Sequence, residues 1–483
     1  MPRQHVRCPP DQRMLDGFAR VRRRLDVPAH FADDVLAAAA NAAALGPRVP
    51  PGASDQIIDA TDLPFVAIDP VGSTDLDQAF CARRTATGYT VFYAIADVAA
   101  FVMPGDPVDA EARRRGLTLY SPDLRTSLHP ESISEQAGSL LEGQLRRALL
   151  WTIDLDHEGE LQQARLERAD VRNRAQLSYG DAQAMVDQVD ADHPVALLAE
   201  IGPKRLALEV ARGAVSLALP SQEVTENAQG GYELEYDESY PIESWNAQIS
   251  LLTGIAASRI MIDGGVGLLR TLPEPDGRTV GRLRRTARAL DIDWPGDVSY
   301  ADRVRDLRPD TPQRAAMLSQ AARGLRGAGY VAFHDHDLPE DPEHSAIAST
   351  YAHVTAPLRR LCDRFANEIV LAQCAGIEPP AWAVEALDEL PSLMGSARSR
   401  DRNLERSIVD FVEAVVLQPH RGETFDAVVT DVDAERDRGR IQLRDPAVVA
   451  RLPATGLELG QPVRVTLLDA DPDAGQVRFA LAD

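Results

Sequence analysis

Three aspartates crowd together in the stretch FVAIDPVGSTDLDQAF, residues 65–80. Asp69 ends a strand-like apolar segment, and the following PVGS favours a tight turn. Asp75 and Asp77 lie two residues apart, so in extended backbone their side chains point to the same face. Carboxylates this close repel one another unless they become protonated or bind a cation. The spacing therefore fits either a site for a hard cation such as Mg²⁺, which can hold a phosphate and activate water, or a solvated Asp-rich turn.

The elements that must position these aspartates begin at about residue 57. DLPFVAID and YTVFYAIADVAAFV alternate as strands do, and RALLWTIDLDHEGEL indicates two strands around an HEGE turn. Helical patterns follow, among them WNAQISLLTGIAASRIMID and the stretch from about 382 to 417. Strands followed by helices predict an α+β domain of some 300 residues.

A helical segment precedes this domain. Residues 11–46 carry apolar side chains at helical spacing and end on Gly46, before the Pro/Gly-rich linker PRVPPGAS. Residues 1–56 contain 8 Arg against 6 acidic residues, so the segment is slightly basic. Two interpretations stay open: helices that contact nucleic acid, and a helical hairpin packed on its neighbour.

The last segment, residues 421–483, consists of short alternating runs separated by Gly, Asp and Pro. Val463, Val465 and Leu467 would share one face of a strand. A small β-barrel is the natural interpretation. The expected organisation is therefore a helical N-terminal domain over 1–56, an α+β domain over 57–417 and a barrel over 418–483.

Composition excludes several classes of protein. The chain of 483 residues is 44% hydrophobic and 26% charged, as expected of a globular protein with more than one domain. Its net charge of −23 points away from a nonspecific nucleic-acid binder, although a channel can be locally basic inside an acidic protein. All but one of the 51 basic residues are arginines, whose planar fork suits phosphate.

Cysteine usage and hydropathy point to a compartment. The four cysteines form no CxxC pair, which argues against a disulfide framework or zinc site and fits a reducing environment. We find no signal-peptide pattern and no apolar run of about 20 residues. We expect a cytoplasmic protein that does not contact a membrane and is a monomer.

Other motifs give little support to competing chemistry. No GxxxxGK[ST] or GxGxxG occurs, so nucleotide hydrolysis and dinucleotide redox chemistry have no support. His334 and His336 in FHDHD could ligate a metal, but they lack a fixed third ligand. A polar loop is the simpler interpretation of that segment.

Four ordered blocks, however, resemble the catalytic RNB domain of the ribonuclease II/R family of 3′→5′ exoribonucleases. The acidic stretch is the first block, and the resemblance extends over roughly residues 57–415. The other blocks are YAIADVAAFV, LTLYSPDLRTSLHPESISEQAGSLLEGQLRRAL and TYAHVTAPLRRLCDRFANEIV. The terminal barrel resembles the S1-type RNA-binding OB fold that follows the RNB domain in that family. The implied fold is an α+β RNB domain with an S1-like barrel.

The resemblance also implies an activity. The implied activity is that of a Mg²⁺-dependent hydrolytic 3′→5′ exoribonuclease, with Mn²⁺ as a substitute metal. Such an enzyme degrades single-stranded RNA to nucleoside 5′-monophosphates in RNA turnover. The family commonly carries two cold-shock OB domains before the RNB domain, whereas about 56 residues that read as helical precede it here. We therefore expect a different entry path for RNA.

Roles for the acidic residues follow from the family positions. The resemblance places Asp69, Asp75 and Asp77 at metal-binding and catalytic carboxylates, and Asp77 is the candidate for activating the water or holding its metal. A fourth family aspartate is Gln78 here, which brings no negative charge and should weaken metal affinity. Gln78 is then a weak ligand or a hydrogen-bonding residue outside the ligand set. An alternative follows from this departure: a catalytically weak RNA-binding regulator that retains the RNB fold.

Four further residues match family positions that contact RNA. Tyr120 matches a tyrosine that stacks near the last nucleotides and helps set where cleavage falls. Arg359 matches the clamp on the scissile phosphate, with Arg360 as its neighbour on the RNA backbone. Glu405 aligns with a glutamate implicated in holding the 3′-terminal nucleotide.

The surroundings of Arg359 leave a second interpretation open. Pro357 can start a helix that runs to about Gly376, which would place Arg359 at a helix N-terminus. The rival role for Arg359 is a surface salt bridge to Asp363, four residues further on.

Overall fold

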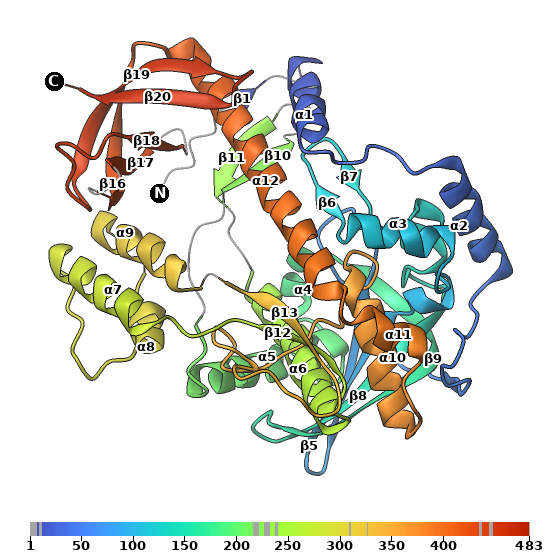
Figure 1. The fold of residues 1–483 in the computed structure, drawn as a ribbon. Helices are drawn as coiled ribbons and strands as arrows, with labels where there is room; N and C mark the ends of the chain where they lie inside the picture. Colours follow the sequence, from blue (N-terminus) through green and yellow to red (C-terminus); the bar gives the residue numbers. More distant parts are fainter. Residues whose placement is uncertain are drawn as a thin grey trace.

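The computed structural model describes residues 7–8, 12–215, 222–226, 232–236, 240–308, 311–325, 327–433, 437–443 and 448–482. Figure 1 shows the C-terminal barrel at one end of the molecule and the mixed sheet with its helices at the other. The long helix α12 (Leu390–Leu417) runs between the two. None of the described helices is long and apolar enough to span a membrane.

A six-stranded mixed sheet forms the centre of the larger domain, in the order β2-β9-β3-β4-β5-β8. Strand β9 pairs with β3 on one side and with β8 on the other, so the sheet curls until its ends meet. The strands are β2 (Ile58–Asp59), β3 (Phe65–Ile68), β4 (Gln78–Thr85), β5 (Gly88–Ala96), β8 (Leu145–Asp156) and β9 (Leu161–Leu177). The predicted strands around the HEGE turn and in the first two blocks are confirmed.

Helices pack on this curled sheet and bury its apolar side chains. The largest core joins Trp151 and Tyr93 of the sheet to Leu252 and Phe365 of the helices. The covering helices are α4 (Tyr179–Met185), α5 (Pro194–Ala211), α6 (Pro241–Asp263) and α10 (Leu361–Ala375). A second core, which includes Leu76 of the acidic stretch, packs under helices α2 (Asp33–Leu45) and α3 (Pro107–Arg115).

The start of helix α10 differs from the prediction. The helix begins at Leu361 and not at Pro357, because Arg360 is held in extended backbone and bridges to Leu117. The Leu361 amide donates to the Gly116 carbonyl at 3.0 Å. Gly376 ends the helix in the left-handed conformation, as its sequence position predicted. Arg359 therefore lies in the turn before the helix.

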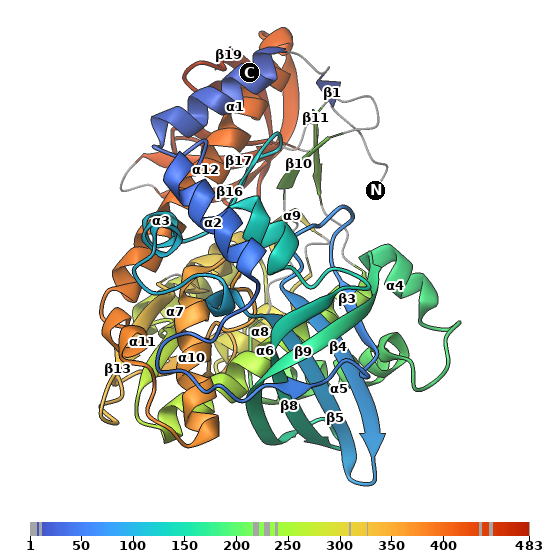
Figure 2. The same ribbon diagram turned by 90° about the vertical axis from the view of Figure 1, so that its right-hand side faces the viewer.

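The N-terminal segment forms the two predicted helices, α1 (Gln12–Arg24) and α2. In both ribbon views α1 lies beside α12 (Figures 1 and 2). Met14, Phe18 and Val21 of α1 pack on the apolar side chains of α12, and the rings of Phe18 and Phe411 meet edge to face at 5.6 Å. The helices thus pack on neighbours, but on different ones, α1 on α12 and α2 on α3.

The C-terminal strands form a nearly closed, OB-like five-stranded barrel in the order β18-β17-β16-β19-β20. Val465 and Leu467 are buried in its core and Val463 packs against it, as their alternation predicted. The strands are β16 (Thr424–Asp433), β17 (Arg438–Leu443), β18 (Val449–Leu452), β19 (Pro462–Asp471) and β20 (Gln476–Leu481). The predicted α+β architecture with a terminal barrel is confirmed.

The remaining elements include three helices that stand apart from the sheet as a small cluster of their own. These are α7 (Gly277–Ala289), α8 (Tyr300–Asp306) and α9 (Pro312–Ala321), the last of which contacts β16. The short strands are β1 (Arg7–Cys8), β6 (Leu119–Tyr120), β7 (Arg125–Thr126), β10 (Gln222–Glu226), β11 (Tyr232–Tyr236), β12 (Gly267–Thr271), β13 (Gly329–Phe333), β14 (Glu343–His344) and β15 (Ser349–Thr350). Helix α11 spans Ala381–Ala386.

Candidate active site

The acidic stretch forms the connection between β3 and β4. Asp69 follows the end of β3, and its amide donates to the Leu177 carbonyl of β9 at 3.1 Å. Leu76 is fully buried, so the residues on either side of it, Asp75 and Asp77, turn away from the core toward the same region. Ser139 fixes the loop, because its hydroxyl accepts from the Leu76 amide at 2.9 Å and donates to the Thr74 carbonyl at 2.8 Å.

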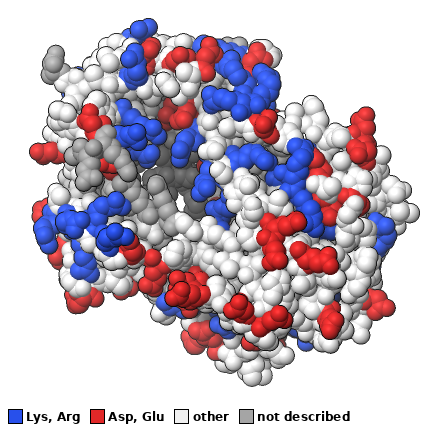
Figure 3. All heavy atoms as spheres, in the orientation of Figure 1, with Lys and Arg blue, Asp and Glu red and all other residues white. Residues whose placement is uncertain are grey.

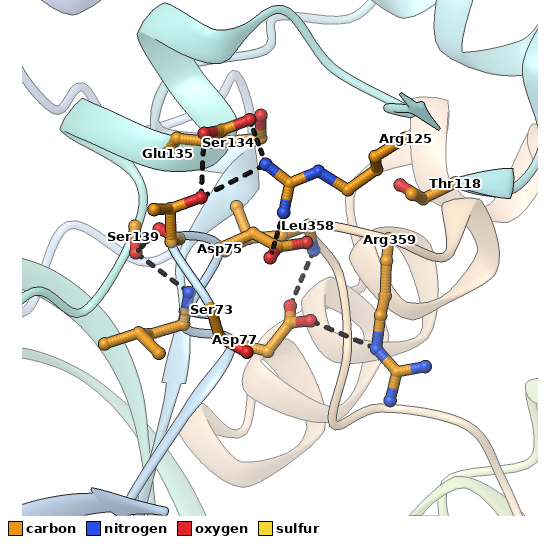
Figure 4. Close-up of polar contacts among 12 residues, drawn as sticks. Ser73, Asp75, Asp77, Thr118, Arg125, Ser134, Glu135, Ser139, Leu358 and Arg359 are labelled. Carbon is orange, nitrogen blue, oxygen red and sulfur yellow. Dashed lines mark hydrogen bonds and ion pairs between the residues drawn. The ribbon is translucent and has the colours of Figure 1, made fainter. Parts of the chain in front are cut away.

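Asp77 meets the segment before α10, which lies 281 residues further along the chain. Its Oδ1 accepts from the Leu358 amide at 2.8 Å, and its Oδ2 lies 3.4 Å from Nε of Arg359 (Figure 4). The Asp77 side chain is 7% exposed, whereas the Arg359 side chain is 48% exposed. Arg359 therefore contacts the acidic stretch with one edge and presents the rest of its guanidinium to solvent.

Asp75 has a different partner, Arg125 in the hairpin of β6 and β7. Nη1 of Arg125 donates to Asp75 Oδ1 at 2.5 Å, and its Nη2 donates to Glu135 and to the Thr74 hydroxyl (Figure 4). Sequence reasoning missed Arg125 and Glu135, although both lie in the third block of the resemblance. The only available signal was an arginine five residues after Tyr120, and its partner at Asp75 could not be read from spacing.

Burial makes this cluster electrostatically unfavourable. It raises the pKa of Asp77 to about 8 and that of Asp69 to about 7, although the nearby Arg359 opposes both shifts. The pKa of Asp75 is also raised by burial, against the effect of Arg125. When all four carboxylates are ionised, Glu135 included, they outnumber the two guanidinium groups by two formal charges. That excess equals the charge of a divalent cation.

The donor set fits such a cation by its chemistry, because Mg²⁺ prefers carboxylate oxygens. In the side-chain arrangement of the described residues, no three His, Cys, Asp or Glu side chains come together closely enough to enclose an ion. Arg125 instead pairs with Asp75, and Arg359 contacts Asp77. A metal site at Asp69, Asp75 and Asp77 stays a prediction that the donor chemistry supports.

Gln78 is engaged at both ends of its amide. Its Nε2 donates to the Thr355 carbonyl at 2.7 Å, and its Oε1 accepts from the Tyr93 hydroxyl. These contacts tie the first residue of β4 to the segment that leads to Arg359. They favour the role of a hydrogen-bonding residue outside the ligand set over that of a weak ligand.

Arg360 is placed differently from its neighbour. Its guanidinium forms a two-pronged pair with Asp363, at 2.5 and 2.8 Å, and the two side chains are 15% and 0% exposed. The buried Asp363 holds the Arg360 side chain inside, which disfavours the predicted contact of Arg360 with the RNA backbone. The rival salt bridge from Arg359 to Asp363 does not form, because Asp363 pairs with Arg360 and Arg359 contacts Asp77 instead.

The other predicted RNA contacts lie on the surface. Tyr120 is 53% exposed at the end of β6, a suitable position for an aromatic ring that stacks on a base. Glu405 is exposed on α12. Neither side chain has a hydrogen bond to the acidic cluster among the contacts of the described residues.

Two of the histidines that the sequence singled out, His353 and His334, pair with protein side chains. His353 is buried beside Tyr330 and Tyr351, its Nδ1 lies 2.7 Å from the Tyr330 hydroxyl, and burial lowers its pKa. His334 pairs with Asp388 at 3.1 Å on the surface. The polar-loop interpretation of FHDHD is the one that the structure supports.

The raised pKa values predict how the metal-free protein responds to pH. Folded Asp69 and Asp77 keep their protons up to about pH 7 and 8, whereas an unfolded aspartate loses its proton near 3.8. The folded state then binds more protons, so stability falls as pH rises toward 8. We expect added Mg²⁺ to raise the melting temperature more at pH 8.5 than at pH 6. Asp69→Asn should shrink that difference, and equal Mg²⁺ shifts at both pH values would contradict the assignment.

Comparison with known proteins decides the family. A model of the RNB domain matches residues 57–374, about two thirds of the chain. A model of the RNase II-type exonuclease C-terminal S1 domain matches residues 423–482. The chain belongs to the RNB, or ribonuclease II/R, family. The resemblance read from the four blocks and from the terminal barrel is confirmed.

Named relatives of this RNB protein are distant. Exosome complex exonuclease RRP44 homolog A of Arabidopsis thaliana is 26% identical over 423 residues, which cover 83% of this chain and 43% of the relative. Ribonuclease R of Escherichia coli is 26% identical over 419 residues, which cover 81% of this chain and 50% of the relative. The chain thus spans half or less of the length of these two relatives.

Solved structures share the fold. Mycoplasma genitalium RNase R, in complex with ribose methylated single-stranded RNA, superimposes with a TM-score of 0.85 at 17% identity. The match covers 98% of this chain and 78% of that one. Yeast Ssd1, described as a pseudonuclease, matches with a TM-score of 0.64 at 14% identity, over 87% of this chain and 53% of Ssd1. The RNB fold therefore includes a protein described as a nuclease and one described as a pseudonuclease.

Proposed function

We propose that this RNB protein is a Mg²⁺-dependent hydrolytic exoribonuclease that shortens single-stranded RNA from its 3′ end and releases nucleoside 5′-monophosphates. The observation that carries the proposal is the meeting of Asp77 with Arg359, from segments 282 residues apart. An acidic cluster beside a half-exposed arginine suits a phosphodiester, whose charge the guanidinium can balance. The family membership supports the same activity.

Each residue at the site has a distinct task in this proposal. Asp69, Asp75 and Asp77 would hold the divalent cation, which when bound lowers the pKa of a water and neutralises phosphate charge. Arg359 donates to the scissile phosphate and opposes the negative charge that grows in the transition state. The Leu358 amide holds Asp77, and Gln78 ties β4 to the Thr355 carbonyl, so both contacts fix the position of the acidic stretch relative to Arg359.

A locally basic surface supports an approach path for RNA. Figure 3 shows Lys and Arg side chains gathered around the hollow between the barrel and α12, whereas acidic side chains dominate the lower edge. At the junction of α1, α12 and the barrel, the half-buried Asp410 is surrounded by arginines from all three parts. They are Arg24, Arg406, Arg440 and Arg451. An acidic protein thus carries locally positive surface, which suits a phosphate backbone.

Tyr120→Ala should weaken the grip on single-stranded RNA. Loss of one stacked base contact costs about 1–3 kcal/mol, so we expect KM for oligo(A) to rise about tenfold with a smaller change in kcat. The length of the final product should also change if Tyr120 lies next to the last nucleotides. Tyr120→Phe keeps the stacking face and should behave as the parent. A KM of the Ala variant equal to that of the parent would contradict a role of Tyr120 in RNA binding.

A second candidate function is a catalytically weak RNA-binding regulator. Gln78 favours it, because a neutral amide stands where the family has an aspartate, and both ends of that amide are engaged by Thr355 and Tyr93. The Ssd1 match shows that the fold occurs in a pseudonuclease.

One assay separates the two functions. Oligo(A) carrying a 5′ label is incubated with the protein in Mg²⁺ or in EDTA, and the products are resolved by length. A ladder that shortens from the 3′ end only in Mg²⁺ supports the enzyme. RNA that is retarded on a native gel but stays intact supports the regulator, and intact, unretarded RNA contradicts both.

A further inference from the structure

Helix α1 reaches the edge of the candidate active site through one buried ion pair. Arg22, near the end of the helix, donates from Nη1 and Nη2 to the two oxygens of Asp123, at 2.5 and 2.7 Å. The two side chains are 9% and 10% exposed. A planar, two-pronged pair shielded from water fixes the relative position of its partners far better than an exposed pair does.

Asp123 lies in the turn of the β6–β7 hairpin, which joins the parts of the site. Tyr120 and Arg125 face each other across this hairpin as paired residues. Arg125 holds Asp75, and just before β6 the Thr118 amide donates to the Arg359 carbonyl at 3.0 Å. The segment from 118 to 126 therefore contacts Asp75 and Arg359 and carries the exposed tyrosine.

The base of the hairpin lies in an apolar cluster that α1 shares with α12. Leu119 is buried in the cluster formed by Met14, Phe18 and Val21 of α1 with Phe411 of α12. Each strand of the hairpin is only two residues long, and such a short ribbon is not stable by itself. Contacts from outside must therefore set its position. The ion pair to Arg22 of α1 holds the turn, and the apolar cluster that α1 shares with α12 holds the base.

We propose that Arg22 is a positioning residue, and that α1 places Tyr120 and Arg125 for catalysis by holding Asp123. The effect on RNA cleavage rests on the proposed function, whereas the mechanical coupling of α1 to the hairpin does not. Without Arg22, the turn loses its anchor, Tyr120 moves relative to the RNA end, and Arg125 no longer holds Asp75 in one orientation.

Amide hydrogen exchange tests the coupling without any reference to RNA. Arg22→Ala and Asp123→Asn should each speed exchange in residues 118–126 at least tenfold and leave the sheet core unchanged. Arg23→Ala is the matched control, because Arg23 is an exposed arginine of the same helix. Asp123→Asn keeps the size of the side chain, so it remains informative if Arg22→Ala fails to fold. Unchanged exchange at 118–126 in a folded variant would overturn the proposal.

RNA cleavage by the same variants tests the consequence. Arg22→Ala and Asp123→Asn should shift the length of the final product in the direction that Tyr120→Ala does, and Arg23→Ala should not. The double variant Arg22→Ala/Tyr120→Ala should shift it no further than Tyr120→Ala alone, because both changes alter the product length through Tyr120. Independent, additive shifts would refute the positioning role. If the parent protein cleaves no RNA, the proposed function fails, while the exchange result still decides whether α1 holds the hairpin.

Discussion

Asp77→Asn is expected to lower the rate of 3′ shortening about a thousandfold and to leave RNA binding intact. Asn keeps the shape of the side chain and can still accept from the Leu358 amide, so the loop should keep its conformation. It loses the charge that faces Arg359 and that would hold the cation. Single-turnover decay of a labelled oligo(A) at saturating protein measures the rate, and filter retention measures binding.

The control for Asp77→Asn is Asp192→Asn. Asp192 pairs with Arg84 on the surface and is 86% exposed, so its replacement removes an aspartate without touching the site. It should cleave as the parent does. Full turnover by Asp77→Asn, or loss of activity in both variants, would reject the role assigned to Asp77.

Arg359→Ala should reduce kcat by about 100- to 1,000-fold without lowering the melting temperature. The guanidinium is half exposed and makes one long contact to Asp77, so the fold depends little on it. Its proposed contribution is to the charge of the transition state, where one lost donor typically costs about 10²–10³ in rate. Arg359→Lys keeps the charge but not the planar fork and should recover part of the loss.

Arg360→Ala is the informative contrast, since it removes the adjacent arginine, which is mostly buried, whereas Arg359 is half exposed. It would leave the buried Asp363 without its partner, and such a loss costs about 3–5 kcal/mol of folding free energy. We expect Arg360→Ala to melt at a lower temperature and Arg359→Ala to melt as the parent. The reverse pattern would contradict the roles given to the two arginines.

Local sequence patterns predicted the elements well where the chain encodes them locally. The alternation in β5 and β19, the turn between β8 and β9 and the glycine after α10 all need only neighbouring residues. The start of α10 was mispredicted because a distant partner, the Gly116–Leu117 backbone, holds Arg360 extended. The tendency of proline to begin a helix, on which the prediction at Pro357 rested, contains no information about a partner so distant in the sequence.

In the candidate site, too, the sequence predicted residues that belong to local motifs but not their partners from distant segments. The three aspartates and Arg359 were found from spacing and resemblance, and the structure brings Asp77 and Arg359 together. The partners of Asp75, Asp123 and Asp363 were not found, because an arginine-rich sequence offers many candidates and only the fold selects among them. The sequence left two interpretations of the N-terminal helices open, contact with nucleic acid and packing on a neighbour. The packing of Phe18 on Phe411 favours the second.

The most direct test of the central claim is the binding of Mn²⁺, a spectroscopically visible substitute for Mg²⁺, to metal-free protein. Free Mn²⁺ is followed by electron paramagnetic resonance during titration of the parent, of Asp75→Asn and of the Asp192→Asn control. The parent and the control should bind the ion with equal affinity and release it to excess Mg²⁺, and Asp75→Asn should bind at least tenfold more weakly. Equal affinity in all three proteins would show that the acidic stretch does not hold the cation.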